Sequence, residues 1–483
     1  MFKKVAVANR GAVAARVVST LREMGVKSAI LCSEADKDLP YVSKADESAV
    51  IGPAPPKDSY LNREAVIATA KALGAEAIHP GWGFLSEDPL FAEMAVAEGL
   101  VFIGPSPKFL SVMGDKVAAR KEMAALGLPV SPSTGLLSGT PAEMAAEAKK
   151  IGFPLMVKPA GGGGGIGMIP VDGEEKLIKA LETAESQALR GFGQAALYCE
   201  KLLVNPRHVE FQVVADKAGG VRHLWERDCS IQRRRQKILE EAGAPNINRE
   251  SLAEMAERAA HVLGCLGYDH LGTVETLYDP DFGFSFLEVN PRLQVEHAVT
   301  EEVTGVDLVA AQIGLAAGLG VETVLESYGR RPGPERGPGS GTESGAKNLA
   351  PAGPKGHALE ARIYAEDPVR FLPSPGKLAV FRPPKERPGL RLLTGYAEGD
   401  AVTPYYDPMI AQLIVSGPDR AAAVAAMAEA LGAFEVEGLK TNIPFLRLMM
   451  GFEPYLAGDL HTGLAERLVG YEGYKEKLEA LKC

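Results

Sequence analysis

The chain is poor in cysteine and aromatic residues, and it contains no long hydrophobic run. Its five cysteines are scattered and never form a Cys-x-x-Cys pair, which argues against a disulfide framework and a zinc site. The longest apolar stretch without a charge, 308–321, covers 14 residues and falls short of the ~20 that a membrane helix needs. We expect a buried helix there. The first residues include no apolar run long enough for a secretion signal. These absences predict a cytoplasmic protein with no membrane partner.

An excess of positive charge is absent as well. The 52 Lys and Arg residues stand against 62 Asp and Glu residues, and the net charge is −10. Such a chain has no general attraction to nucleic acid, which we therefore do not expect as a partner. With 46% hydrophobic and 24% charged residues, the composition is typical of a globular protein with a real core. At about 150 residues per domain, the length suggests roughly three domains.

Patterning along the chain predicts an α/β and α+β multidomain fold. Short β-branched runs alternate with helical patterns in the first part, which predicts a parallel sheet covered on both faces. A segment with eight Gly and five Pro indicates a flexible linker or a surface insertion. The expected divisions are an N-terminal domain at 1–113, an α+β body at 114–328 with a smaller unit at about 130–203, the linker at 329–356, a third α+β unit at 357–465 and a tail at 466–483.

Five consecutive glycines, 161–165, follow a predicted strand at 155–158. Ordering such a run costs much chain entropy, so it usually marks close backbone approach to a ligand or a moving lid. The dinucleotide-binding interpretation fails, because the sequence that follows, 168–171, cannot open a helix. Lys158, inside the strand, favours a phosphate ligand. A surface loop without a ligand is the alternative.

A predicted hairpin brings two glutamates together. Glu288 and Asn290 are two residues apart and point to the same face of one strand. The turn lies midway between Glu275 and Glu288, so the two carboxylates are expected to face each other and to repel unless a cation lies between them. Oxygen ligands of this kind suit Mg²⁺ with nucleotide phosphates. A solvated polar face is the competing interpretation.

Charged residues continue directly after this hairpin. Arg292, Gln294 and Glu296 keep a period of two, and an arginine fork can grip a small planar oxyanion while a nearby glutamate acts as a general base. A salt bridge is the ordinary alternative. The basic stretch 226–237, expected as a loop, indicates either a solvated charge run or a second contribution to oxyanion binding. His208 by itself is typical of a structural histidine.

Taken together, these segments resemble biotin carboxylase, the ATP-grasp component of biotin-dependent carboxylases. The resemblance extends from Val5 to about Leu460, and its most specific motifs, besides Lys158 with the glycine run, are Ala8-Asn-Arg-Gly11, His79-Pro-Gly-Trp-Gly-Phe-Leu-Ser-Glu87, Met113-Gly-Asp-Lys116, Asn205-Pro-Arg-His-Val-Glu210, Arg227-Asp-Cys-Ser230, Arg292-Leu-Gln-Val-Glu-His297 and Phe371-Leu-Pro-Ser-Pro-Gly376. It implies an N-terminal parallel-sheet domain, an ATP-grasp domain with a mobile Gly-rich lid, and a C-terminal α+β domain of the biotin carboxylase type.

The resemblance also implies the chemistry and the site. In that family ATP phosphorylates bicarbonate to carboxyphosphate, which collapses to CO₂ and phosphate; the phosphate takes the ureido proton of biotin, and the nitrogen attacks CO₂. The implied catalytic residues are Lys237, Arg292, Gln294, Val295, Glu296 as the base and Arg362. The implied ligands of ATP are Lys116, Lys158, Gly164, Gly165, Glu200, Lys201, Leu202, Leu203, His208, Gln232, Arg235, Glu275 and Glu288. Glu275, Glu288 and Asn290 match the ligands of Mg²⁺, for which Mn²⁺ is a substitute.

Some positions depart from the family pattern. Ile166 and Ile169 stand where lid cations are usual, Arg235 stands where a His is usual, and Trp82 replaces a Tyr. No Met-Lys dipeptide of a biotin carrier occurs, so we expect the carrier protein and the carboxyltransferase on separate chains, with a homodimer of this chain. The expected enzyme is the biotin carboxylase subunit of an acetyl-CoA or related acyl-CoA carboxylase. A 2-oxoacid (pyruvate-type) carboxylase, another ATP-grasp carboxylate–amine ligase and a non-catalytic nucleotide-binding scaffold are the alternatives.

Overall fold

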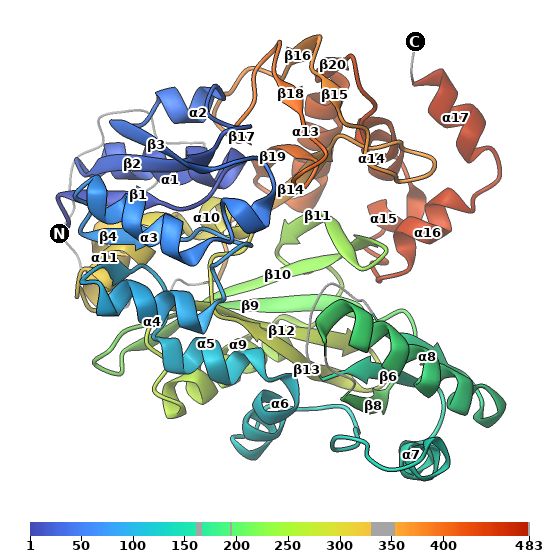
Figure 1. The fold of residues 1–483 in the computed structure, drawn as a ribbon. Coiled ribbons are helices and arrows are strands. Elements are labelled where there is room, and N and C mark those ends of the chain that lie inside the picture. Colours follow the sequence, from blue (N-terminus) through green and yellow to red (C-terminus); the bar gives the residue numbers. More distant parts are fainter. Residues whose placement is uncertain (161–166, 194–195, 330–352, 482–483) are drawn as a thin grey trace.

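The computed structural model describes residues 1–160, 167–193, 196–329 and 353–481 (Figure 1). The predictions for Gly164, Gly165 and Ile166, and for most of the linker, fall outside these residues. The N-terminal and C-terminal ends of the described chain lie on different sides of the molecule (Figure 1). Among the described residues, no helix combines the length and the apolar character that crossing a bilayer requires.

The N-terminal unit is the predicted parallel sheet. Its five strands run in the order β3-β2-β1-β4-β5, all parallel. At Gly11 the backbone φ of +63° permits the tight turn from β1 into α1, and a Cβ on Gly395 would lie 2.5 Å from the Gly11 Cα. The C-terminal part of the chain thus packs closely on this turn. The elements are β1 (Lys4–Val7), α1 (Gly11–Glu23), β2 (Lys27–Ser33), α2 (Pro40–Ser43), β3 (Glu47–Gly52), α3 (Arg63–Ala72), β4 (Ala77–His79), α4 (Pro89–Ala97), β5 (Val101–Phe102) and α5 (Pro107–Gly114).

A small three-stranded sheet forms the predicted lid unit. The strands run in the order β7-β6-β8, and their buried side chains pack against α7 and α8. Gly193, with φ +69°, ends α8 in the left-handed conformation that such a helix end favours. The elements, with the helix that leads into the unit, are α6 (Lys116–Ala125), α7 (Pro141–Ala148), β6 (Leu155–Pro159), β7 (Ile169–Val171), α8 (Glu174–Phe192) and β8 (Leu197–Lys201).

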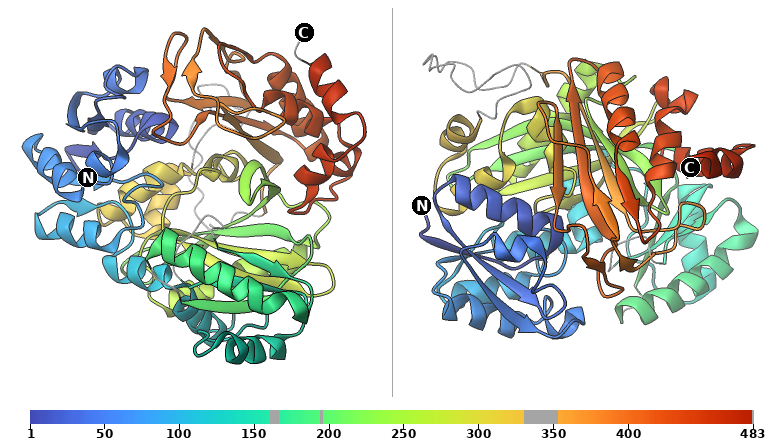
Figure 2. Two further views of the ribbon diagram at one scale, coloured as in Figure 1. Left: turned by 45° about the vertical axis from the view of Figure 1, so that its right-hand side comes forward. Right: turned by 90° about the horizontal axis from the view of Figure 1, so that it is seen from above.

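One antiparallel sheet of eight strands joins the α+β body at 114–328 to the C-terminal unit. Its order is β13-β12-β9-β10-β11-β14-β19-β17, so strands from before and after the linker pair directly (Figure 2). From the sequence, these strands were expected in separate units. The strands are β9 (Arg207–Ala215), β10 (Val221–Arg233), β11 (Gln236–Ala242), β12 (Leu271–Asp279), β13 (Gly283–Asn290), β14 (His357–Tyr364), β17 (Leu390–Thr394) and β19 (Met409–Gly417).

Two local predictions are wrong. The stretch 226–237 is not a loop: it forms the end of β10, a tight turn at Arg234 and Arg235 with φ of 50° and 67°, and the start of β11. The apolar stretch 308–321 is buried along 308–315 but partly exposed along 316–320, and it is helical only as α11 (Leu308–Ala316), because Gly318, with φ +89°, turns the chain before α12 (Val321–Tyr328). The helix ends there because the chain turns at the glycine, even though the sequence remains apolar.

The remaining elements cover the central sheet and complete the C-terminal unit. Helix α13 packs on β19. The elements are α9 (Arg249–Cys265), α10 (His297–Thr304), β15 (Gly376–Lys377), β16 (Val380–Arg382), β18 (Ala401–Val402), α13 (Arg420–Gly432), β20 (Glu435–Glu437), α14 (Ile443–Met450), α15 (Glu453–Leu456), α16 (Leu464–Val469) and α17 (Tyr474–Ala480).

Candidate active site

A pocket of about 900 Å³ lies between the lid strands and the central sheet. Its volume is in the range of small-molecule and cofactor sites. It gathers side chains from β6, β8, the β10–β11 hairpin, β12, β13 and β14. The predicted site residues that the structure describes all line it: Lys116, Lys158, Glu200, Lys201, Leu202, Leu203, His208, Gln232, Arg235, Lys237, Glu275, Glu288, Asn290, Arg292, Gln294, Val295, Glu296 and Arg362.

The ammonium of Lys237 is the centre of the polar part of the pocket. It lies 2.6 Å from a carboxylate oxygen of Glu210, 2.6 Å from one of Glu275 and 2.7 Å from one of Glu296. These glutamates come from β9, from β12 and from the connection that precedes α10. One cation therefore holds together three carboxylates from separate segments.

Glu296 is held as a carboxylate by two cations. One oxygen accepts from Lys237, and the other accepts from Arg362 Nη2 at 3.0 Å. Burial by itself raises the pKa of Glu296, but the charges of Lys237, Arg362 and Arg227 outweigh burial, and the pKa lies below its ordinary value. Burial likewise lowers the pKa of Lys237, and its carboxylate partners outweigh burial and raise that pKa. Glu296 is thus ionised, and Lys237 is charged.

Arg227 is a buried cation beside the pocket whose contacts were not apparent from the sequence. Its guanidinium is fully buried and donates to Glu210 Oε1 at 2.5 Å, to Gln294 Oε1 at 2.5 Å and to Thr300 at 2.9 Å. Gln294 in turn donates to Glu275 at 2.8 Å. The motif that includes Arg227 was visible in the sequence, but its partners lie on β9 and around α10, far away in the chain.

The predicted metal ligands lie where the expected hairpin places them. Glu275 and Glu288 are direct register partners on β12 and β13, and Asn290 pairs with Thr273. Each carboxylate, however, contacts a different lysine, because Glu275 lies 2.6 Å from Lys237, which it shares with other glutamates, while Glu288 lies 2.9 Å from Lys116. Repulsion between the facing carboxylates is therefore relieved by two ammonium groups. All three donors are oxygens next to one pocket, which suits Mg²⁺.

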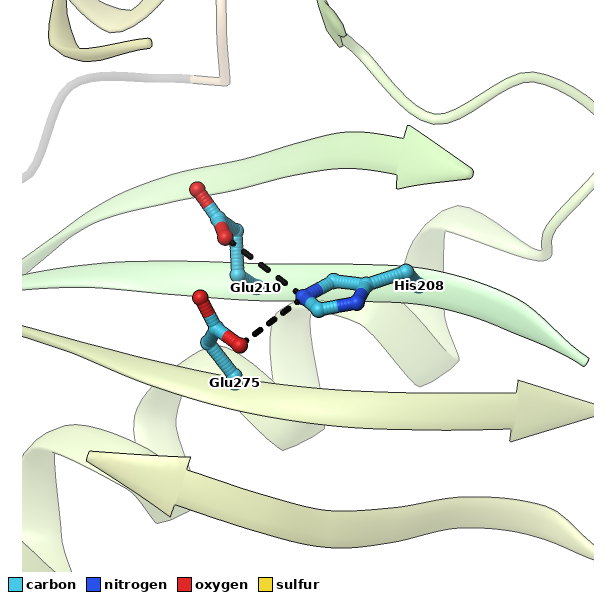
Figure 3. A group of neighbouring side chains, drawn as sticks. All are labelled: His208, Glu210 and Glu275. Atoms are coloured by element: carbon cyan, nitrogen blue, oxygen red, sulfur yellow. Dashed lines mark ion pairs between the residues drawn. The ribbon is translucent and has the colours of Figure 1, made fainter. Parts of the chain in front are cut away.

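A second group of metal-ligating types lies beside this hairpin. Figure 3 shows the imidazole of His208 directed at Glu210 and Glu275, with Nε2 at 3.7 and 3.1 Å from their oxygens. The other ring nitrogen of His208 lies 3.1 Å from the amide of Gln232. Lys237 also contacts both of these glutamates, so its ammonium already supplies a positive charge to this group.

Arg292 was expected to grip a planar oxyanion. Its Nε donates to Glu87 of the N-terminal unit, and its Nη2 donates to Asn290 Oδ1 at 3.0 Å. The connection 291–296 is irregular rather than a strand, so the period of two along it does not reflect a pleat. Arg292, Gln294 and Glu296 nevertheless all reach the pocket.

The lid side of the pocket combines one buried ion pair with apolar walls. Lys158 contacts Glu200 across the β6–β8 pair, and Arg120 lies 3.6 Å from the same glutamate. Arg235, at the tip of the β10–β11 hairpin, reaches Met156 of β6. Further lining residues were not predicted, because they carry no motif that singles them out: Met156, Tyr198, Leu277, Leu287, Thr462, Gly463 and Glu466.

Comparisons with known proteins agree with this architecture. Three family models match in order along the chain: "Biotin carboxylase, N-terminal domain" at residues 1–110, "Carbamoyl-phosphate synthase L chain, ATP binding domain" at 115–324 and "Biotin carboxylase C-terminal domain" at 360–467. Biotin carboxylase of Halalkalibacterium halodurans is 43% identical over 465 residues, which cover 96% of this chain and 97% of that protein. The chain belongs to the biotin carboxylase family. It is accordingly an enzyme subunit of the ATP-grasp ligase class, a biotin carboxylase component of biotin-dependent carboxylases.

Relatives within the family serve different carboxylases. A pyruvate carboxylase subunit of Methanothermobacter thermautotrophicus is 42% identical over 463 residues, covering 96% of this chain and 89% of that protein. The biotin carboxylase domain dimer of Hydrogenobacter thermophilus 2-oxoglutarate carboxylase, solved with MgADP, ADP and bicarbonate, superposes with a TM-score of 0.88. It is 38% identical and covers 98% of this chain and 99% of that chain. The predicted three-part biotin carboxylase fold is confirmed.

Proposed function

We propose that this chain carboxylates biotin on a separate carrier protein, with ATP and bicarbonate, through carboxyphosphate. The observation that supports this most strongly is the arrangement of Lys237, Glu296 and Arg362 in one pocket with the oxygen donors of the β12–β13 hairpin. The similar domain dimer that was solved with MgADP and bicarbonate supports the same substrates.

ATP is proposed to lie under the lid. Lys116 and Lys158 face the pocket and carry the charge that phosphate oxygens need, with Gly164 and Gly165 assigned to the same task from sequence alone. Residues 200–203, where β8 ends, would line the adenine, and His208, Gln232 and Arg235 would contact the rest of the nucleotide. Closure of the lid over these groups would keep water from carboxyphosphate.

Glu275, Glu288 and Asn290 are the proposed ligands of Mg²⁺ or Mn²⁺. They fit such an ion because they are oxygen donors on adjacent strands, and because the Glu288 side chain keeps 31% exposure in the pocket. When bound, the ion supplies positive charge to the phosphate oxygens. Lys116, 2.9 Å from Glu288, would add a second positive charge beside the same phosphates.

Bicarbonate is proposed to bind next to Glu296, against Lys237, Arg292 and the Val295–Gln294 backbone. Glu296, ionised as described, removes the bicarbonate proton so that an oxygen of bicarbonate attacks the γ-phosphorus of ATP and ADP leaves. Arg362 lies 3.0 Å from Glu296 and would hold the phosphate released from carboxyphosphate. The same guanidinium would then stabilise the negative charge on the biotin oxygen after phosphate takes the ureido proton.

The carrier and the carboxyltransferase are proposed to be separate chains, and the assembly is proposed to contain a homodimer of this chain. An acyl-CoA such as acetyl-CoA is the first candidate for the final acceptor. A 2-oxoacid is the second, because this chain is similar to a pyruvate carboxylase subunit and to the biotin carboxylase domain of a 2-oxoglutarate carboxylase.

Four described cysteines are free thiols, which supports a cytoplasmic location. The divisions near 113, 329 and 357 remain the proposed boundaries.

The decisive experiment measures ADP release from MgATP with free biotin, with and without bicarbonate. We expect release that needs both, and a loss of about 1,000-fold in Glu296→Gln because the general base is gone. Glu326→Gln, an exposed change on α12, is the matched control and should behave like the parent protein. Turnover that ignores biotin but responds to another acid and amine would identify a different carboxylate–amine ligase. ATP binding without turnover would identify a scaffold.

Co-purification with the carrier and the carboxyltransferase, followed by comparison of acetyl-CoA with pyruvate as acceptor, tests the finer assignment. Carboxylation of acetyl-CoA supports the first candidate. Carboxylation of pyruvate alone replaces it with the second.

A further inference from the structure

A second pair of facing glutamates lies behind Arg362. Glu240 on β11 and Glu360 on β14 are direct register partners in the central sheet. Both side chains are fully buried. Facing carboxylates on neighbouring strands repel, and this pair is cut off from water that could screen the repulsion.

The pair is connected to the reactive groups of the pocket on two sides. Arg362 Nε lies 2.6 Å from Glu240 Oε1, while its Nη2 donates to Glu296. Gln412 of β19 donates from one amide nitrogen to Glu360 Oε1 at 2.7 Å and to the Val295 carbonyl at 2.8 Å. The guanidinium and the backbone beside Glu296 are therefore both anchored to the pair.

Several carboxylate oxygens of the pair have no hydrogen-bond donor among the described residues. Glu360 Oε2 has no hydrogen-bond partner, and neither oxygen of Glu240 has a donor in hydrogen-bonding geometry among the described residues, although Arg362 is close enough for an ion pair. Buried carboxylate oxygens without donors are costly. A proton on one of the two glutamates supplies the missing donor and removes the repulsion at the same time.

The charges around Glu240 and Glu360 also favour a state in which the pair carries one proton. With both glutamates ionised, Arg362 would be surrounded by three carboxylates, those of Glu240, Glu360 and Glu296. The helices α10 and α13 pack on β14, and their charged residues have partners elsewhere. Glu301 of α10 pairs with Arg16, and Arg420 of α13 pairs with Glu241. The other charged or titratable groups that influence the pair are Lys237, Glu296, Arg362, Tyr364 and Cys229.

We propose that Glu240 and Glu360 share a single proton, carried by Glu360, and that the ionised Glu240 positions Arg362 for the reactants. This rests on the proposed function, in which Arg362 holds phosphate and the biotin oxygen. Glu360 would donate its proton to Glu240 and accept from Gln412. Arg362 then faces one carboxylate of the pair instead of two, and it keeps positive charge for anions in the pocket.

The direction of the pKa values agrees with this assignment. Burial raises the pKa of Glu240 to about 7 despite the opposing charge of Arg362. Burial, followed by the charge of Glu240, raises the pKa of Glu360 well above its ordinary value. Glu240, which contacts the guanidinium, is the member that ionises first.

Infrared spectroscopy of the free protein tests the proton directly and does not depend on activity. At about pH 8, well above the ordinary glutamate pKa of about 4.3, a protonated carboxylic acid band should be present and should shift in D₂O. Glu360→Gln should remove this band. Absence of such a band in the parent protein, or its persistence in Glu360→Gln, would overturn the proposal.

The matched variants Glu240→Gln and Glu360→Gln test the positioning. Glu360→Gln replaces the acid with an amide that also donates, so kcat/KM for bicarbonate should stay within about threefold, whereas Glu240→Gln should lose about 100-fold. Thermal melting shows whether each variant is folded; if Glu240→Gln is not, the infrared result decides. Equal losses in two folded variants would contradict the assignment of different roles. If the parent protein lacks biotin carboxylation altogether, the proposed function fails while the infrared test remains valid.

Discussion

Replacing Lys237 with methionine isolates the charge at the centre of the site. The ammonium lies 2.6–2.7 Å from three buried carboxylates, and its side chain is only 13% exposed. Methionine keeps much of the length and removes the charge. Removing one partner of a buried ion pair costs about 3–5 kcal/mol, because it leaves an uncompensated buried charge. We expect the free energy of unfolding to fall by about this amount near neutral pH.

The loss should depend on pH in a defined direction. In the parent protein the pKa of Glu275 is lowered: burial opposes ionisation, but Lys237 and His208 outweigh it. Glu275 therefore stabilises the fold above its unfolded pKa of about 4.3, and this contribution fades as the pH falls towards the folded pKa. Without Lys237, burial dominates and raises the folded pKa, so the ionised form destabilises the variant until acid protonates it. The difference between the two proteins should shrink by about 2 kcal/mol between pH 8 and pH 5.

Urea unfolding at both pH values measures this difference. Lys179→Met, an exposed change on α8, is the matched control and should shift stability by less than about 0.5 kcal/mol. An equal loss for Lys237→Met at both pH values would show that packing, not charge, is responsible. A loss no larger than that of the control would refute the role of Lys237 as the shared cation.

Three further predictions concern metal, nucleotide and acid. Glu288→Gln should raise the Mg²⁺ concentration for half-maximal ADP release about tenfold, whereas Asp281→Asn, an exposed change in the turn of the same hairpin, should not; equal requirements would argue against Glu288 as a ligand. Lys158→Met should raise KM for ATP about tenfold and leave KM for bicarbonate nearly unchanged, since its amine lies on the lid side; a parallel rise in both would contradict a specific phosphate contact. Burial, the largest cause, lowers the pKa of His79 to about 3, so the stability that neutral His79 contributes is complete above pH 6.5 and is lost as the pH falls towards 3. Urea midpoints between pH 6.5 and 5 should therefore fall less steeply in His79→Gln, and an unchanged slope would refute the reasoning.

Features set by neighbouring residues were predictable from the sequence. The turn at 280–282 predicts the β12–β13 hairpin, and the expected pairing of Glu275 with Glu288 is confirmed. The register next to the turn would by itself set Glu275 opposite Leu287, and a one-residue shift between Glu275 and Thr276 brings Glu275 opposite Glu288. The alternation of strand and helix likewise predicted the N-terminal parallel sheet. The resemblance to a family then identified further residues that line the pocket. Local sequence patterns could not have shown that Lys116 on α6 and Arg362 on β14, which are far apart in the chain, line the same pocket.

Tertiary structure decided what those residues contact. The pairing of β11 with β14 joins two units across the linker and sets Glu240 opposite Glu360. No local sequence pattern predicts this pairing. In the sequence Lys237 is one cation of a basic stretch expected as a loop, yet it is a hairpin residue that contacts carboxylates from three segments. Composition and periodicity determine which side chains are buried and on which face of a strand they lie. Which buried charge meets which depends on contacts between distant segments, whose energies are decided only when the whole sheet has formed.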